Sequence, residues 1–276
     1  MLNAIINNHL FDTITQQCYS IFNMKYFSLP AFEKTGLVRT VFTTSENIAW
    51  KYGEEGCFEN FSEFGQSLGI KPDQMVKTIQ KHTSIIRIVT KDNAGEGVSR
   101  PISLEYEEYD GLITNEKKLL LCTVEADCVP VYLLDTEKKV IGMVHSGWKG
   151  TVKRISEVAI NLMVEKFGCN PANILSGLGP HICKNCYEVG QDVYDEFALG
   201  GFKELNRIFY RKNDKKSEQK YLLNLEEAVK LTVMECGVPE GNISSSGYCT
   251  KETVSFCSYR RTKSPCERML TAIMLV

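Results

Sequence analysis

Apolar residues recur along the chain with two different periods, and these periods predict both strands and helices. Short apolar alternations mixed with Pro and Gly over residues 27–43 predict strands and turns. Over residues 59–81 the apolar spacing predicts two short helices, separated at residues 69–72. The β-branched residues 84–90 predict a strand that ends in the turn-rich sequence DNAGEG.

The middle of the chain has the clearest pattern. Residues 110–114 predict a turn and the start of a strand, and residues 119–135 predict two apolar strands with a break between them. Residues 139–145 predict a core strand, which runs into the sequence SGWKG. The apolar positions of residues 151–167 then lie on one face of a helix.

The last third of the chain mixes both element types. We predict a strand over residues 173–179, a helix over 188–197 and a second helix over 225–236. Residues 211–220, RKNDKKSEQK, contain five basic residues and no aliphatic or aromatic ones, which is typical of a solvated loop. The sequence VSFCSYR, residues 254–260, has a strand-like pattern, and a short apolar segment closes the chain.

The composition is that of a packed globular protein. The 276 residues carry 32 Lys and Arg against 34 Asp and Glu, and this balance argues against a nucleic-acid partner. Hydrophobic residues make up 43% of the chain, but no apolar run of about 18 residues occurs, so we expect no membrane span. Without an internal repeat or a linker, the chain is predicted to form a single domain.

The cysteine content points to a reduced compartment. Eleven cysteines cannot all pair internally, and a chain of this length does not need disulfides to fold. The N-terminal residues contain no Lys or Arg before residue 25 and are unlike a signal peptide. We therefore expect a cytoplasmic protein in which most thiols are buried as small apolar groups.

The histidines and one cysteine offer metal-site chemistry. Of four histidines, His82, His145 and His181 lie next to strand ends or turns, where sites gather in α/β proteins. Cys128 follows Asp127 at the break between two strands. A thiolate with two imidazoles makes a three-ligand zinc site with an open fourth position, although the spacing of these residues matches no compact zinc finger.

The segment HICKNC offers a rival site. It places His181, Cys183 and Cys186 close together and contains a C-x-x-C pair. A structural zinc site would need a second C-x-x-C pair, and none is obvious in the sequence. A thioredoxin-type redox pair would need a βαβ setting near the N-terminus. Buried or incidental thiols are the alternative interpretation.

Several motifs resemble one known family in order and approximate spacing. The sequences QKHTSIIRIV, DGLIT, ADCVPVYLLD, VHSGWKGTVKRI, GPHICKNCYEVG and SFCSYRR are similar to those of the YfiH-like proteins, also called laccase-domain or multicopper polyphenol oxidase family proteins. The resemblance runs from about Phe27 to the C-terminus, which leaves residues 1–26 as an N-terminal extension of the single domain 1–276. It implies an α+β fold, an α/β/β/α sandwich related to the catalytic domain of cytotoxic necrotizing factor.

The resemblance also implies a metal and an activity. Members bind Zn²⁺ through two histidines and a cysteine, which fall on His82, Cys128 and His145. The implied activity is purine nucleoside phosphorolysis, with adenosine deaminase and methylthioadenosine phosphorylase activities in the same site. A purine nucleoside and phosphate are thus the expected partners. Copper is the less favoured metal, because a multicopper oxidase needs many histidine ligands and this chain has four histidines.

The chain departs from the family pattern at three places without changing the predicted ligands. Ser45 follows FTT where members carry Arg and a Gly-Gly turn. His181 replaces a small residue, and Cys266-Glu267-Arg268 replaces Thr-Gly-Arg.

Further residues are candidates for the chemistry. Asp127 and Glu188 could transfer protons, or they could cap a turn and start a helix. Arg260 suits a phosphate because its planar guanidinium group can bind an oxyanion with two parallel hydrogen bonds. Trp148 could stack on a purine or pack in the core.

Two other functions remain open at this stage. Cys128 could act as a nucleophile with His145 as its base, in an amidase-type hydrolase. The chain could also be a non-enzymatic regulator of cell-wall or division processes.

Overall fold

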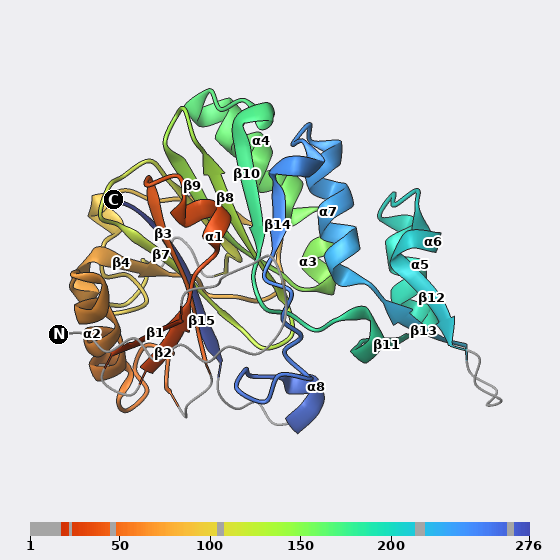
Figure 1. Cartoon of the computed structure of the whole chain (residues 1–276), viewed down its shortest axis with the longest axis horizontal. Helices are drawn as coiled ribbons and strands as arrows, with labels where there is room; N and C mark the ends of the chain where they lie inside the picture. Colours follow the sequence, from red (N-terminus) through yellow and green to blue (C-terminus); the bar gives the residue numbers. More distant parts are fainter. Residues whose placement is uncertain (1–17, 22–23, 45–47, 104–107, 213–218, 264–267) are drawn as a thin grey trace.

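Two six-stranded mixed sheets lie face to face in the computed structural model (Figure 1). The structure describes residues 18–21, 24–44, 48–103, 108–212, 219–263 and 268–276. The first sheet has the order β1 (Cys18–Ile21), β2 (Met24–Phe27), β3 (Val38–Thr43), β15 (Met269–Leu275), β7 (Leu120–Glu125), β4 (Met75–Lys77). The second has the order β14 (Ile243–Ser245), β10 (Ile174–Leu178), β8 (Val129–Asp135), β9 (Val140–Ser146), β6 (Gly111–Thr114), β5 (Ile86–Ile88).

Helices cover the outer faces of both sheets. The described helices are α1 (Pro30–Glu33), α2 (Cys57–Leu68), α3 (Trp148–Val152), α4 (Ile155–Phe167), α5 (Gln191–Leu199), α6 (Leu205–Ile208), α7 (Leu225–Glu235) and α8 (Tyr259–Thr262). α2 packs on the first sheet, while α4 and α7 pack on the second (Figure 1). The layers therefore run helix, sheet, sheet, helix, and the predicted α+β class is confirmed.

A third, smaller sheet lies beside α5 and α6, at the right of Figure 1. It has the order β11 (Glu188–Gly190), β13 (Lys220–Leu223), β12 (Phe209–Lys212), with antiparallel pairing throughout. Of the predicted loop 211–220, residues 211 and 212 belong to β12 and residue 220 to β13, while residues 213–218 lie outside the described part of the chain.

Strand β8 shows why the central strands read as unbroken apolar runs. All seven of its residues are buried. Val131 and Leu133 face the helices of the second sheet, whereas Tyr132 and Leu134 pack between the two sheets. A strand covered on both faces has no solvent side on which polar residues could alternate.

Most predicted elements of the middle of the chain are confirmed. The pattern of residues 119–135 gives β7 and β8, that of 139–145 gives β9, and that of 225–236 gives α7. The helix predicted over 151–167 is divided into α3 and α4, because Arg154 adopts a left-handed conformation between them. The helix predicted over 188–197 begins only at Gln191, after the short strand β11.

Two predicted elements are wrong. The second helix within residues 59–81 is instead a 3₁₀ turn followed by β4, because Met75 and Val76 pair in parallel with β7 and fill the core there. The predicted strand 254–260 is a turn leading into α8. Phe256 and Cys257 are buried without strand pairing, and the Ser258 hydroxyl caps the helix by accepting a hydrogen bond from the Arg261 amide.

The residues at both ends of the chain are only partly described. Residues 18–21 and 24–27 form the edge strand pair β1–β2 of the first sheet, which lies within the predicted N-terminal extension 1–26 except for its last residue, Phe27. Ser45, Cys266 and Glu267, which depart from the family pattern, lie outside the described residues.

Two further findings concern the membrane and the thiols. No helix among the described residues has both the length and the apolar character needed to span a bilayer. The cysteines whose side chains are described are all free thiols.

Candidate metal centre and active site

The donor atoms of His82, Cys128 and His145 lie within 4.8 Å of one another. The Cys128 Sγ atom is 3.8 Å from His82 Nε2, and the two imidazole rings meet edge to face at 4.9 Å between centroids. The structure thus brings together the three residues that the sequence singled out as zinc ligands.

Strand pairing in the second sheet places two of these residues. Val129, which follows Cys128, pairs with Ser146, and Pro130 pairs with His145. The turn before β8 and the end of β9 are therefore neighbours. His82 reaches them from the segment after β4, in a left-handed backbone conformation with φ 59°.

Asp110 holds both histidines in position. The Nδ1 atom of His145 lies 2.7 Å from the Asp110 carboxylate, and the backbone amides of Lys81, His82 and Thr83 donate to the same carboxylate. Burial alone would raise the pKa of Asp110, but the hydrogen bonds from His145 and Thr83 hold it well below its usual range. A carboxylate on Nδ1 leaves Nε2 of His145 available as a ligand atom, as in many metal sites.

The two imidazoles have different protonation behaviour. Burial and the neighbouring charge of His145 lower the pKa of His82 to about 4, so its imidazole is neutral at physiological pH. Burial by itself would lower the pKa of His145, but Glu125, Cys128 and Asp110 outweigh this effect and raise it well above the usual value. The groups around His145 thus favour a positive charge at this position.

Gly147 leaves space beside the ligands that no other residue would leave. A Cβ atom there would lie 2.7 Å from His82 Cδ2 and 2.8 Å from Cys128 Sγ. Glycine is therefore required by the packing of the donor atoms themselves.

The donor set fits a zinc ion. One thiolate and two imidazoles are borderline-soft ligands that zinc accepts, and three protein ligands leave a fourth position for substrate. The donors already lie near the separations of about 3.3–3.8 Å expected between ligands of a tetrahedral zinc ion.

Glu125 is a site residue that the sequence analysis missed. Its side chain is 0% exposed, and neither carboxylate oxygen has a hydrogen-bond partner among the described residues. Its Oε2 atom lies 3.6 Å from His145 Nε2. Burial raises the pKa of Glu125 to about 7, an effect that nearby His145 partly offsets. The sequence feature that could have indicated Glu125 is its position as an acidic residue within an apolar run, directly before Ala126-Asp127-Cys128.

Asp127 serves as an anchor between loops. Its carboxylate accepts hydrogen bonds of 2.6 Å from the Thr250 hydroxyl and from the backbone amide of Arg260. Its backbone is left-handed, with φ 85°. Both carboxylate oxygens are therefore engaged by protein donors.

Tyr187 and Arg260 form a wall close to Cys128. The Arg260 guanidinium carbon lies 4.9 Å from the centroid of the Tyr187 ring, and Nη1 donates to the Glu188 carbonyl oxygen. Burial first, and then the nearby Cys128 and Asp127 groups, raise the pKa of Tyr187. The backbone of Arg260 is thus tied to Asp127, the residue before Cys128, while its guanidinium group packs on Tyr187.

The carboxylate of Glu188, a candidate proton-transfer group, contacts Lys212. Its half-exposed carboxylate accepts a hydrogen bond of 2.5 Å from Lys212 Nζ, which lowers its pKa. Only its backbone carbonyl contacts the wall, through Arg260. The structure does not group this carboxylate with the three donor residues.

Arg268 is a basic residue to which the sequence analysis gave no role. Its positive charge contributes to lowering the pKa of both His82 and Glu125, behind the larger effects of burial and the nearer groups. Trp148, by contrast, is half-buried against the core under the second sheet, with Lys149 Nζ 5.6 Å from its ring centroid, and this favours a packing role.

The HICKNC segment does not act as one cluster. The His181 ring is buried between the Gly179 carbonyl oxygen and the Glu226 carboxylate. Cys183 and Cys186 instead group with Cys249 and Glu252.

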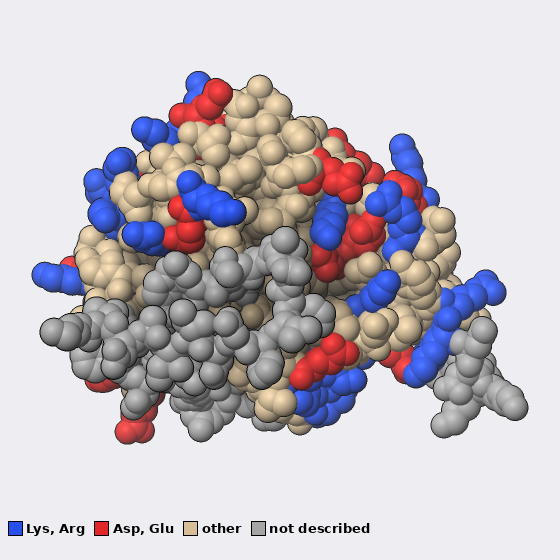
Figure 2. Space-filling model, viewed as in Figure 1, with Lys and Arg blue, Asp and Glu red and all other residues tan. Residues whose placement is uncertain are grey.

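Among the described residues of the face in Figure 2, groups of Lys and Arg (blue) and of Asp and Glu (red) lie among uncharged residues (tan). These described residues form no continuous basic surface on this face.

Comparisons with known proteins agree on one family. Residues 32–276 match the family described as "Multi-copper polyphenol oxidoreductase laccase". The chain is 35% identical over 196 residues to purine nucleoside phosphorylase YlmD of Bacillus subtilis, a match that covers 70% of this chain and 68% of that protein. It is 30% identical to adenosine deaminase RL5 of an unknown prokaryotic organism, over 75% of this chain and 77% of the relative. The crystal structure of the YfiH protein of Bacillus licheniformis superposes with a TM-score of 0.81 at 28% identity, covering 91% of this chain and 96% of that one.

Proposed function

This chain belongs to the multi-copper polyphenol oxidoreductase laccase family, and on that basis we propose that it is a zinc-dependent purine nucleoside phosphorylase. We further propose that adenosine deamination and methylthioadenosine phosphorolysis take place in the same site. Relatives named purine nucleoside phosphorylase and adenosine deaminase support a nucleoside-processing enzyme. The observation that carries the proposal is the three-donor cluster of His82, Cys128 and His145, with Asp110 behind it.

The donors of this chain suit a single zinc ion and do not suit a centre of several coppers. Each of the three residues supplies one ligand atom, and one sulfur with two nitrogens suits an open zinc site. When bound, zinc would supply a Lewis acid that polarises a substrate oxygen. A reaction centre of several coppers would need more histidines than the four in the chain.

In phosphorolysis the bond between the purine nitrogen and the sugar carbon breaks, and a phosphate oxygen bonds to that carbon. We propose that Arg260 orients the phosphate with its guanidinium group. The departing purine takes up a proton. Glu125 is the proposed donor because burial raises its pKa to about 7, so that its carboxyl group still holds a proton near neutral pH.

In deamination a water adds to the purine carbon and ammonia leaves. A carboxyl group must move a proton from the water to the leaving nitrogen, as in other zinc deaminases. Glu125 is the proposed shuttle here too, in place of Glu188, whose carboxylate pairs with Lys212. Asp127 is proposed to position the loop of Arg260 through the bond between its carboxylate and the Arg260 amide.

One experiment tests the function directly. Metal content is measured on the purified protein, which is then incubated with adenosine with and without phosphate, and the products are separated. Adenine with ribose phosphate supports phosphorolysis, inosine supports deamination, and 5′-methylthioadenosine tests the third activity. Cys128→Ala should lose one metal ion and all three activities. Cys236→Ala changes a half-buried cysteine at the C-terminal end of α7 and should keep the metal and the activities. Full metal and full activity in Cys128→Ala would refute the assignment.

A second candidate function rests on a specific geometry. Cys128, His145 and Asp110 also have the contacts of a cysteine nucleophile, a base and an orienting carboxylate. This arrangement would support an amidase-type hydrolase, the activity class suggested by the predicted relation to cytotoxic necrotizing factor. A metal-free protein that is alkylated at Cys128 and hydrolyses glutamine amides would favour it, because zinc and a thiol nucleophile compete for the same sulfur. A protein that turns over none of these substrates would favour the non-enzymatic regulator.

A further inference from the structure

We infer that Cys183, Cys186, Cys249 and Glu252 form a second metal site, of the closed zinc type, that ties together two loops beside the proposed active site. Their donor atoms lie within 4.8 Å of one another. None of them belongs to the first cluster, so this site is a separate one.

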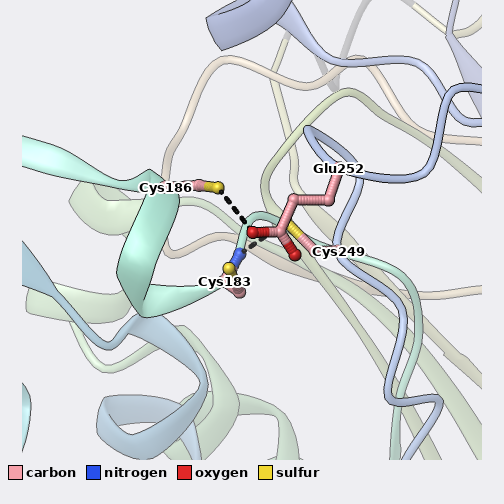
Figure 3. Close-up of side chains that lie close together, drawn as sticks. All are labelled: Cys183, Cys186, Cys249 and Glu252. Carbon is pink, nitrogen blue, oxygen red and sulfur yellow. Dashed lines mark hydrogen bonds between the residues drawn. The ribbon is translucent and has the colours of Figure 1, made fainter.

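Figure 3 shows how the four side chains converge. Cys183 precedes a short 3₁₀ turn and Cys186 is its last residue, while Cys249 and Glu252 come from the loop after β14. The Glu252 carboxylate extends into the space between the sulfur atoms (Figure 3). The Cys186 thiol donates to Glu252 Oε1 over 3.3 Å.

The chemistry of this set selects a single zinc-type ion. Three thiolates and one carboxylate supply four ligands, the number that closes a tetrahedral zinc site. With zinc–sulfur bonds of about 2.3 Å, the sulfurs of such a site lie about 3.8 Å apart, so the side chains need to close in by about 1 Å at most. Each thiol would release its proton to solvent as the ion binds.

The backbone around the four side chains also suits a metal site. The backbone amide of Cys183 donates to Cys249 Sγ at 3.3 Å, and a donor of this kind stabilises a thiolate. His181 and Cys249 form a parallel bridge, which fixes the two segments side by side. The spacing is also regular, since both halves have two residues between their ligands, as Cys-x-x-Cys and Cys-x-x-Glu.

The proposed ion would stabilise the wall of the first site. One tied segment leads directly into Tyr187, and the other contributes Thr250, whose hydroxyl binds Asp127. Ile182 donates its amide to the Asp127 carbonyl oxygen from the first segment. An ion that joins the two segments would therefore hold both against the residue that precedes Cys128. The metal site itself does not depend on which substrate the enzyme uses.

The test counts metal in matched variants of the full chain. Wild-type protein and the variants Cys128→Ala, Cys186→Ser, Glu252→Gln and Cys236→Ser are expressed with added zinc, purified under reducing conditions and analysed by elemental mass spectrometry. We expect two ions in the wild type and in Cys236→Ser, and one in Cys128→Ala and in Cys186→Ser. The combined variant Cys128→Ala/Cys186→Ser should hold none. Glu252→Gln should lose the second ion to a chelator at least ten times faster than the wild type does.

A spectroscopic readout keeps the test valid if a variant folds poorly. Cobalt added to metal-free wild-type protein should give sulfur-to-cobalt charge-transfer absorption from two sites, of which Cys128→Ala retains the component of the three-thiolate site. Equal metal content in Cys186→Ser and the wild type would overturn the proposal. A disulfide between Cys183 and Cys186 in reduced, zinc-supplemented protein, found by peptide mapping, would overturn it as well.

Discussion

A methyl group at Gly147 is the sharpest perturbation of the proposed metal centre. The added Cβ would lie 2.7 Å from His82 Cδ2 and 2.8 Å from Cys128 Sγ, whereas ordinary contact begins at 3.4 Å. The two ligands would have to shift by about 0.6–0.7 Å, several times the tolerance of about 0.2 Å in zinc–ligand distances. Gly147 has φ −75° and ψ 168°, a conformation that alanine adopts freely, so backbone strain adds nothing.

We expect Gly147→Ala to weaken metal binding by about 10–100-fold, comparable to the loss of a partner that orients a ligand. That loss corresponds to about 1.4–2.7 kcal/mol. Nucleoside turnover at limiting zinc should fall in parallel. The affinity is measured by competition with a chromophoric chelator, and the thermal unfolding of the metal-free protein shows whether the fold itself has changed.

Gly241→Ala is the matched control, because a Cβ there meets nothing within 4 Å. It should bind metal and turn over substrate as the wild type does. The reasoning would be refuted if Gly147→Ala kept wild-type metal affinity and wild-type turnover, since two ligands cannot both tolerate this overlap and remain in place.

Three further predictions follow from the same geometry. In the metal-free protein, the raised pKa of Glu125 stabilises the fold below its unfolded-state value of 4.5, and this contribution is lost as the pH rises through about 7. The free energy of unfolding relative to Glu125→Gln should therefore fall by up to about 3 kcal/mol between pH 4.5 and 7, and equal pH slopes in denaturant titrations would contradict this. Arg260→Lys should raise the KM for phosphate by about tenfold, because a bidentate contact is lost. Its adenosine deamination, which uses no phosphate, should be unchanged, and a matching loss there would argue for a general structural effect. Asp110→Asn should lower zinc affinity about 10–100-fold by removing the charge behind His145. Chelator competition measures this, and wild-type affinity would show that Asp110 does not orient the ligand.

The three donor residues of the first site could be found in the sequence because each lies beside a pattern break. Cys128 lies where two apolar strands separate, and His145 comes at the end of a strand before a Gly-rich turn. The family motifs then indicated which histidines to pair with the cysteine. Glu125 was missed because a single acidic residue in an apolar run does not change the strand prediction, and only tertiary packing shows that it faces His145.

Longer-range groupings could not be predicted in the same way. Cys249 and Glu252 join Cys183 and Cys186 across 66 residues, and no local period connects such segments. The prediction of a second helix over Met75 and Val76 was wrong for a related reason, because parallel pairing with β7 outweighed the local apolar spacing. Local sequence patterns were enough to predict the strands and helices of the buried centre. The groupings that depend on contacts between distant loops could be seen only in the structure.

The origin of the first three donors in distant segments has a consequence for how the protein acquires its metal. His82 precedes Cys128 by 46 residues, and only the pairing of β8 with β9 brings the end of β9 to Cys128. An unfolded chain therefore cannot capture the ion as a zinc-finger peptide does, and loading should come after the sheets have formed. Because copper generally outcompetes zinc for such ligands, the ion found after purification should depend on which metal the growth medium supplies. Growing the same cells with zinc or with copper in excess should therefore yield one fold with two different metal contents.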